Sequence, residues 1–461
     1  MKIRTILPIV LLLCVTIICL IGTATHADRP NDSTTTPDNV STRPSVTSST
    51  NNIGSPIAND WTYGDATVLS SAAYRAANSV TPTNLSKGEY DLEIWDGSIA
   101  DSFAAGNGSE TEPYLIENAS QLALMAYWVN DVGYDLSDTS FALGCDIALN
   151  SYTDMTSADT AVPANIWTPI GGVGETAFSG RFDGNGFIIY GIYTENAESG
   201  GLFGFCAGNA KVYQESETPT CVIANLKISH SYINASRFVA AVCGRAQDGV
   251  LFENIEASST VTIHTTAGYD DSSSGTIVGS GSGISLLRCT SSATVDGFAV
   301  SGFYSYVGGI VGSFYGVIEE SGFFGTVYSD GVGGLIAGRA GSPTKGSGII
   351  RSSVSKGTLH CGPDNMYAGA LCGISSAASG DIYNSIENCI ISARLFRSST
   401  DSCIGIISGI HMSSGTIKNV AYNAEKMVND STDGICGYGF SLNQRYFEDV
   451  IPLPDSAFSE N

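Results

Sequence analysis

Charged side chains are scarce in this 461-residue chain, and positive ones are the scarcest. Asp, Glu, Lys and Arg make up 14% of the sequence, against roughly 25% in an average soluble protein. Lys and Arg total 21 against 45 Asp and Glu, which gives a formal net charge of -24. An acidic surface repels phosphate backbones and anionic lipid head groups. The composition therefore disfavours nucleic acid as a partner, and it disfavours binding to membrane surfaces.

Short motifs for metal and redox chemistry are also missing. The five histidines are His26, His230, His264, His360 and His411, and none is followed by Glu-x-x-His. That motif would place two ligands on one helix face. No Cys-x-x-Cys occurs either. We therefore predict no metal site, no cofactor and no catalytic residues, and we expect the strand-flanking His230 and His264 to be exposed or hydrogen-bonded.

A disulfide framework is not needed for size, because a chain of this length can bury a large core. Ten cysteines follow the N-terminal region: Cys145, Cys206, Cys221, Cys243, Cys289, Cys361, Cys372, Cys389, Cys403 and Cys436. Several lie in the apolar part of a repeat, where a buried cysteine behaves as a small hydrophobic residue. We favour interior packing, and pairing across adjacent coils stays an alternative.

Glycine, by contrast, is abundant and periodic. The chain has 53 glycines, and Val307-Gly-Gly-Ile-Val-Gly312 and Val332-Gly-Gly-Leu-Ile-Ala-Gly338 are two copies of one unit. Aligned on their last glycine, the copies fall at 204, 244, 279, 312, 338, 373 and 409. A period of roughly 20–50 residues indicates a solenoid or a propeller. A propeller is disfavoured, because each unit has too few strand-length runs for a four-stranded blade.

The repeat therefore predicts an all-β fold, a right-handed parallel β-helix with an N-terminal strand-and-helix cap. We expect the apolar residues of the repeats to stack in register inside the solenoid: Ile310, Val311, Leu335, Ile336, Ile406 and Ile407. The repeat glycines would allow positive φ and close approach of neighbouring backbones. The Ser- and Gly-rich segments 266–283 and 339–348 are expected to be loops between coils, where solenoids usually bind ligands.

The remaining segments divide the chain into five parts. Residues 1–27 have a basic start, an apolar run and small residues, as in a cleaved export signal, with an uncleaved membrane anchor as the alternative. Residues 28–60 are predicted to be a disordered tether. Residues 61–140 form the cap, where Asn118 and Gln121 suggest a capping box and Leu122, Met125, Ala126 and Val129 share one helix face. Repeats occupy 141–425, and 426–461 form a C-terminal cap or tail.

A family resemblance rests on an ordered set of short motifs. They are Trp95-Asp-Gly-Ser, Gly106-Asn-Gly-Ser, Pro113-Tyr-Leu-Ile, Trp167-Thr-Pro-Ile-Gly171, Phe178-Ser-Gly-Arg-Phe-Asp-Gly-Asn-Gly186 and Gly201-Leu-Phe-Gly204. Over residues 94–425 the chain resembles GLUG-repeat proteins, which are exported microbial surface proteins. The resemblance implies a pectin-lyase-like parallel β-helix and surface display, adhesion, or accessory repeats beside a separate enzyme domain. Later repeats depart from Gly-Leu-Phe-Gly, which leaves the number of coils open.

Two groups of residues are candidates for function. Asp270 and Asp271 form the only Asp pair; they are expected to be a solvated loop, although clustered carboxylates could serve an enzyme that cuts acidic polysaccharides. Tyr304 and Tyr306 are weak candidates for a binding face, because tyrosine rings can stack on sugars or on a partner protein. An aromatic ladder within the solenoid is the alternative.

The sequence as a whole favours an exported, secreted or cell-surface protein that acts in adhesion or ligand binding without catalysis. Its partner would be a surface glycan or a protein ligand. A polysaccharide-degrading β-helix enzyme, either a lyase or a glycoside hydrolase, is the first alternative. A structural spacer is the second.

Overall fold

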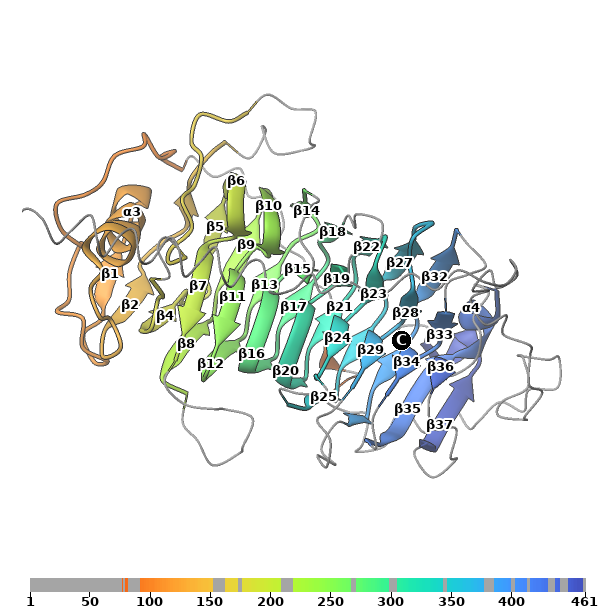
Figure 1. The fold of residues 1–461 in the computed structure, drawn as a ribbon. Coiled ribbons are helices and arrows are strands. Elements are labelled where there is room, and N and C mark those ends of the chain that lie inside the picture. The colour runs from red at the N-terminus through yellow and green to blue at the C-terminus, as the bar shows by residue number, and fades with distance from the viewer. Residues whose placement is uncertain are drawn as a thin grey trace, which may run out of the picture. The chain divides into compact units, whose positions relative to one another are not determined.

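Short strands and tight turns wind the chain into a parallel β-solenoid, in which each coil lies on the one before (Figure 1). The computed structural model describes residues 77, 79–81, 92–151, 162–172, 176–208, 219–266, 271–297, 305–342, 346–376, 385–398, 403–412, 415–429, 436–439 and 447–458. The predicted export signal, the predicted tether, Asp270 and Tyr304 lie outside the described residues. The prediction of a parallel β-helix with a helix near its N-terminal end is confirmed.

Three rows of parallel strands run along the larger sheet. Row 1 consists of β1 (Tyr114–Ile116), β2 (Ser140–Leu143), β4 (Arg181–Asp183), β8 (Cys221–Ala224), β12 (Val250–Glu253), β16 (Val278–Leu287), β20 (Val311–Glu319), β25 (Gly348–Arg351), β30 (Ile386–Glu387), β35 (Ile417–Asn423) and β37 (Phe447–Leu453). Row 2 consists of β7 (Phe203–Ala207), β11 (Cys243–Gln247), the first halves of β16 and β20, β24 (Ala337–Ala340), β29 (Cys372–Ser375), β34 (Ser408–His411) and β36 (Cys436–Gly439). Row 3 consists of β3 (Ile147–Ala148), β5 (Ile188–Tyr190), β9 (Lys227–Ser229), β13 (Glu256–Ala257), β17 (Thr290–Ser291), β21 (Gly322–Phe323), β26 (Val354–Ser355) and β31 (Ile390–Ile391), which pairs with β35.

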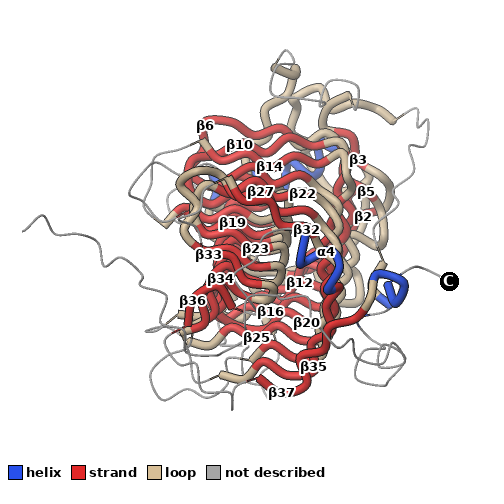
Figure 2. Tube along the Cα trace, turned by 90° about the vertical axis from the view of Figure 1, so that its right-hand side faces the viewer, coloured by secondary structure: helices blue, strands red, loops and turns tan. Residues whose placement is uncertain are grey.

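Two further rows form the smaller sheet, and Figure 2 shows the rows nearly end on. Row 4 consists of β6 (Tyr193–Gly200), β10 (Ser231–Val239), β14 (Val261–Thr265), β18 (Thr294–Gly297), β22 (Thr326–Ser329), β27 (Thr358–Cys361) and β32 (Arg394–Arg397). Row 5 consists of the end of β10, β15 (Ser272–Ser274), β19 (Ser305–Gly308), β23 (Val332–Gly334), β28 (Tyr367–Gly369) and β33 (Cys403–Gly405). The chain passes from row 5 to rows 2 and 1, then to row 3 and row 4, before the next coil begins.

The interior is a set of stacked side chains held in register by the parallel pairing. In row 1, Leu286 pairs with Ile318, which pairs with Ile350 in the next coil, and all three are buried. The six residues predicted to stack inside the solenoid are all fully buried. Burying one aliphatic side chain of this size contributes roughly 1.5–3 kcal/mol. Because every coil repeats this arrangement, the apolar ladder is the main source of stability of the solenoid.

The repeat glycines allow the backbones of neighbouring strands to approach closely, and they do not form left-handed turns. A Cβ at Gly312 would lie 2.5 Å from the carbonyl oxygen of Gly279 and 2.5 Å from the amide nitrogen of Ser274. None of the seven aligned glycines has positive φ. That part of the expectation is wrong, because these glycines lie inside row 2 strands, against which the row 5 backbone packs too closely for a side chain.

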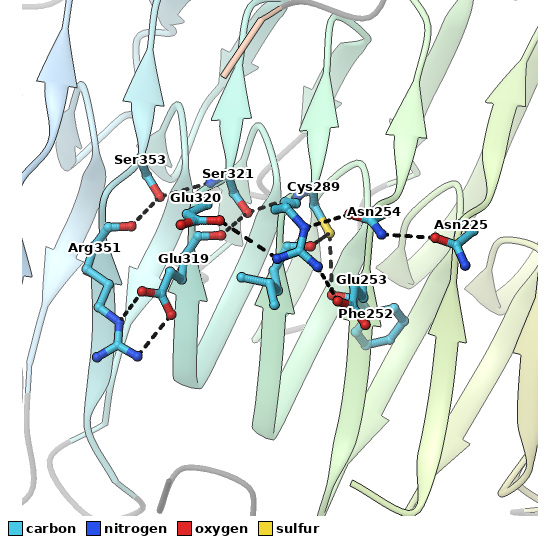
Figure 3. A network of polar contacts seen from close by, with 12 residues as sticks. Asn225, Phe252, Glu253, Asn254, Cys289, Glu319, Glu320, Ser321, Arg351 and Ser353 are labelled. Carbon is cyan, nitrogen blue, oxygen red and sulfur yellow. Dashed lines mark hydrogen bonds and ion pairs between the residues drawn. The ribbon is translucent and has the colours of Figure 1, made fainter. Parts of the chain in front are cut away.

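Left-handed residues are found instead at the corner that follows the row 1 strands from β8 to β30. Asn225, Asn254 and Arg288 have φ values of 52°, 53° and 55°, a region in which asparagine is enriched several-fold among non-glycine residues. Nδ2 of Asn254 donates to Oδ1 of Asn225 at 2.9 Å, and Nε of Arg288 donates to Oδ1 of Asn254 at 2.8 Å (Figure 3). Further along, Arg351 forms an ion pair with Glu319 at 2.9 Å. The corner is therefore a polar ladder that links successive coils.

The predicted N-terminal helix is α3 (Ala119–Tyr127), which continues as a π-helical turn, η2 (Trp128–Val132). Oδ1 of Asn118 accepts from the amide of Gln121 at 3.0 Å, and Oε1 of Gln121 accepts from the amide of Glu117 at 2.7 Å. Leu122 and Met125 are fully buried in the same core cluster as the first strands. The N-cap role of Asn118 and the buried helix face are confirmed, while Gln121 bonds the amide one residue before the N-cap and not that of Asn118 itself.

One local expectation needs correction. The Ser-rich segment 266–283 was expected to be a loop, but β15 and the start of β16 lie within it. Serines pair well there, because their small side chains fit between closely packed coils. Near the C-terminal end, a short helix, α4 (Ala424–Asn429), precedes β37 and a 3-10 turn, η5 (Asp455–Phe458), follows it. Among the described residues, no helix is long and apolar enough to span a membrane.

Candidate ligand-binding groove

An elongated groove runs along the outside of the solenoid, where row 2 and row 5 meet. Its volume is about 580 Å³. The lining residues are Arg237, Phe238, Arg245, Ala246, Gln247, Asp271, Ser273, Ser280, Gly281, Ser282, Tyr306, Ser313, Tyr315, Arg339, Gly341 and Ser342. Serine hydroxyls dominate this list, so the groove offers many hydrogen-bonding groups and little apolar surface. We name this hollow the arginine groove.

The repeat register explains how these side chains come together. The residue after the last glycine of each repeat points outward from row 2, and pairing aligns Phe205, Arg245, Ser280, Ser313 and Arg339 on successive strands. Neighbouring strands are about 4.8 Å apart, so three steps place Arg245 and Arg339 roughly 14 Å apart along the stack. The two small serines between them leave the hollow open.

Arg339 lies at one end of the groove, against the ring of Tyr306. Its guanidinium carbon is 5.3 Å from the ring centroid, and its Nη1 donates to the Tyr306 hydroxyl at 3.2 Å. Its Nε donates to the carbonyl of Gly341 at 3.0 Å. The tyrosine itself is only 6% exposed. These contacts hold the guanidinium in one place with its positive charge facing the groove.

Two other arginines line the opposite end. The guanidinium of Arg245 lies 4.6 Å from the ring centroid of Phe205, and its Nη2 donates to Oε1 of Gln247 at 3.4 Å. Arg237 lies over the ring of Phe238 at 4.8 Å and forms an ion pair with Glu198 at 2.8 Å. Each arginine is thus stacked on an aromatic ring, which limits its side-chain freedom.

A smaller hollow adjoins this end and shares Phe238 and Arg245 with the groove. Its volume is about 240 Å³, and its other walls include Pro169, Gly171 and Glu198. An extended ligand longer than the arginine groove could therefore continue into it without leaving the surface.

The structure brings together two of the four residues singled out from the sequence. Tyr306 lines the groove as a buried support for Arg339, so its ring face is covered and not offered for stacking. Asp271 is exposed and also lines the groove. Their partners Tyr304 and Asp270 lie outside the described residues.

Sequence reasoning missed the arginines. Arg245 and Arg339 each follow the last glycine of a repeat, at 244 and 338. Aligning that position across repeats would have shown two arginines separated by two serines in one column. The glycines and the apolar residues define the interior of the coil, whereas this column of side chains lies on its outer face.

A second surface feature is an aromatic row on the outer face of row 4. Tyr328 and His360 stack at 4.8 Å with their planes 12° apart, and His360 and Phe396 stack at 4.9 Å and 11°. Asp296, Asp330 and the first two of these rings, Tyr328 and His360, border a hollow of about 450 Å³. The rings cover each other's faces and present mainly edges to solvent, so the row is poorly shaped for stacking on a sugar.

The histidines form ordinary polar contacts. Nδ1 of His264 lies 3.1 Å from Oδ2 of Asp296, and Nδ1 of His230 lies 2.8 Å from the Ser229 hydroxyl. Within the described ranges, no group of three or more His, Cys, Asp or Glu side chains is arranged to hold a metal ion. The hydrogen-bonded state expected for these two histidines is confirmed.

No protein-family model matches the chain. A candidate Gly-rich membrane protein of Evansella cellulosilytica is 30% identical over 147 residues, which are 31% of this chain and 14% of that protein. The match thus spans about a seventh of the relative's length.

One solved structure is similar in its chain path. It is a candidate immunoglobulin A1 protease from Bacteroides ovatus, with 20% sequence identity and a TM-score of 0.39. The similarity covers 68% of this chain and 86% of that one. A likeness of this degree implies nothing about activity.

Proposed function

We propose that this protein is an exported β-solenoid that binds an extended ligand in the arginine groove without converting it chemically. The observation that carries the proposal is the groove itself, about 580 Å³ in volume and lined by hydroxyls and three stacked arginines. A structural spacer would need no such concentration of supported polar groups on one face.

Export and surface display rest on other features. The N-terminal 27 residues have the pattern of an export signal or membrane anchor. The relative from Evansella cellulosilytica is described as a membrane protein. The GLUG resemblance of residues 94–425 adds surface display to the proposal on the strength of sequence motifs.

The alternative function is a polysaccharide-degrading enzyme, and Asp271 in the groove is the observation in its favour. Glycoside hydrolysis usually employs two carboxyl groups that flank the scissile bond. Asp271 is the single carboxylate among the described groove-lining residues. Glu198 lines the adjoining hollow, where it is ion-paired with Arg237. Binding without turnover is therefore the better-supported function.

The test is to screen the full-length protein on a glycan array and, in parallel, for release of new reducing or unsaturated ends from polysaccharides, with and without calcium. We expect binding without product release. Product release that is lost in Asp271→Ala would establish the enzyme instead.

A groove-filling variant links the binding to this site. Ser313→Trp places a large side chain in the middle of the groove, between Arg245 and Arg339. We expect it to abolish binding while the far-ultraviolet circular dichroism spectrum is unchanged. Thr326→Trp, on β22 of row 4, is the matched control and should bind like the unmodified protein. Retained binding in Ser313→Trp would place the ligand elsewhere.

A further inference from the structure

We propose that the ligand of the arginine groove is an acidic saccharide chain, whose carboxylate or sulfate groups bind Arg339 and Arg245. This inference rests on the proposed function, and it names the chemical class of the ligand and the residue that selects it.

Arg339 is held in place by neutral groups among the described residues. Every contact given for its guanidinium is with a neutral group, namely the Gly341 carbonyl, the Tyr306 hydroxyl and the Tyr306 ring. The described residues provide no carboxylate within ion-pair distance of it. Other cations of the solenoid are ion-paired, as Arg288 is with Glu253 and Arg351 is with Glu319.

This contrast matters because the chain carries 45 acidic residues and only 21 lysines and arginines. An arginine in such a protein has many carboxylates to choose from, yet Arg339 is oriented by a ring and two neutral oxygens. The planar guanidinium recognises carboxylate and sulfate oxygens through paired hydrogen bonds. A positive group held in place and left uncompensated inside a hollow therefore favours an anionic ligand.

The geometry favours a saccharide over a peptide. The groove runs across the strands, so the backbone groups of its floor are already used in coil-to-coil pairing. An extended peptide binds best by adding main-chain hydrogen bonds at a free sheet edge, and the groove offers none. The half-buried serines at 280, 282 and 313 are instead suited to the many hydroxyls of a sugar chain.

Tyr306 acts as a positioning residue for Arg339. It is almost fully buried, its hydroxyl accepts from Nη1, and its ring supports the guanidinium from below. Arg245 also lies over an aromatic ring, that of Phe205. Arg245 and Arg339 would thus bind two anionic groups at separate points along one chain.

The experiment measures binding of the full-length protein by calorimetry to two matched pairs of polymers. Polygalacturonate and its methyl ester test carboxylates on one backbone, and dextran sulfate and dextran test sulfates on another. We expect the charged member of at least one pair to bind at least tenfold more tightly than its neutral partner, with an affinity that falls as salt is raised. The pair that shows the difference identifies the anionic group.

Variants assign the effect to the groove. Arg339→Gln should weaken binding of the acidic polymer by about ten- to a hundredfold, the range for a lost hydrogen bond to a charged group. Tyr306→Phe should weaken it by about fivefold, because the lost hydroxyl positions the guanidinium and does not itself bind the ligand. Arg394→Gln, at an exposed arginine on β32 of row 4, is the matched control and should have no effect.

Other outcomes overturn the inference in distinguishable ways. Equal binding of the neutral polymers, lost in Ser313→Trp, would leave the binding function standing and remove the acidic ligand. Acidic binding that is unchanged in Arg339→Gln would remove this site. Binding of polyglutamate with the same dependence on Arg339 would replace the saccharide with an acidic peptide. No binding to any polymer or array glycan would overturn both proposals.

Discussion

The repeat glycine at 312 offers the sharpest test of how the coils pack. In Gly312→Ala, the new methyl group would lie 2.5 Å from the Gly279 carbonyl oxygen, 2.5 Å from the Ser274 amide nitrogen and 2.8 Å from the Ser273 carbonyl carbon. Both sides of the methyl group are backbone, so no side chain can rotate away. Rows 2 and 5 would have to separate locally.

Overpacking of this kind typically costs about 1–3 kcal/mol, and we expect the upper end here, because the clash involves backbone on both sides. With an unfolding entropy of about 2.1 cal/mol/K per residue, a loss of about 3 kcal/mol lowers the Tm of a body of about 350 residues by roughly 4 °C. Urea unfolding followed by tryptophan fluorescence, and thermal unfolding followed by circular dichroism, both measure the effect.

The matched control is Gly144→Ala, between β2 and β3. There the methyl group would meet only side-chain atoms of Glu117 and Leu115, at 2.9 Å and 3.2 Å. Those side chains can shift, and alanine reduces the entropy of the unfolded chain, so we expect a change within about 1 kcal/mol. If the two variants lose the same stability, close backbone approach is not the reason for the repeat glycine.

Three further predictions concern the corner, the cysteines and one histidine. Asn254→Ala should lose about 2 kcal/mol, because alanine is strained at a φ of 53° and the bonds to Asn225 and Arg288 are lost, whereas Asn254→Gly should lose about half as much in the same urea assay. Burial raises the pKa of Cys289 to about 12, so this thiol should resist alkylation at pH 8 in the folded protein and react once urea unfolds it, as mass spectrometry would show. Burial lowers the pKa of His411 below 6.5, so the unfolded state binds the proton more readily. The stability that neutral His411 contributes should be lost as the pH falls below about 6.5 towards the lower pKa of the folded state. His411→Gln should reduce that loss in urea midpoints measured at pH 7.5 and 5. Full alkylation of Cys289 before unfolding, or an unchanged pH dependence in His411→Gln, would contradict the last two.

The buried cysteines follow the prediction of interior packing. The structure contains no disulfide among the ten described cysteines, and seven of them are buried. All seven belong to the main core with its aliphatic and aromatic side chains, and the thiol of Cys206 also contacts those of Cys221 and Cys243. The apolar character of the surrounding repeat was a better guide than the number of cysteines.

Local sequence signals were sufficient to predict the parallel β-helix and the helix α3. The glycine period indicated stacked coils, because only a repeating unit needs the same small residue at the same place every time. The capping residue Asn118 and the apolar face of Leu122 and Met125 indicated α3, because a helix depends on residues within a few positions of one another.

The polar corner and the strand at Ser272–Ser274 were not predictable in the same way. A serine run has low intrinsic preference for strand, and β15 forms because β10 and β19 pair with it on both sides. Left-handed Arg288 and Glu320 share a corner with Asn254 although their side chains have little in common. These conformations are imposed by the neighbouring coils.

The stacking of repeated β-coils around an apolar interior could be predicted from the sequence, because that information is periodic and lies within each repeat. The arginine groove could not, because it depends on contacts between coils. Arg245 and Arg339 are 94 positions apart in the sequence, and the register of β11, β16, β20 and β24 brings them into one column. The support of Arg339 by Tyr306 depends on two rows meeting at one edge. Contacts between coils create the groove, and such contacts are set by the folded backbone.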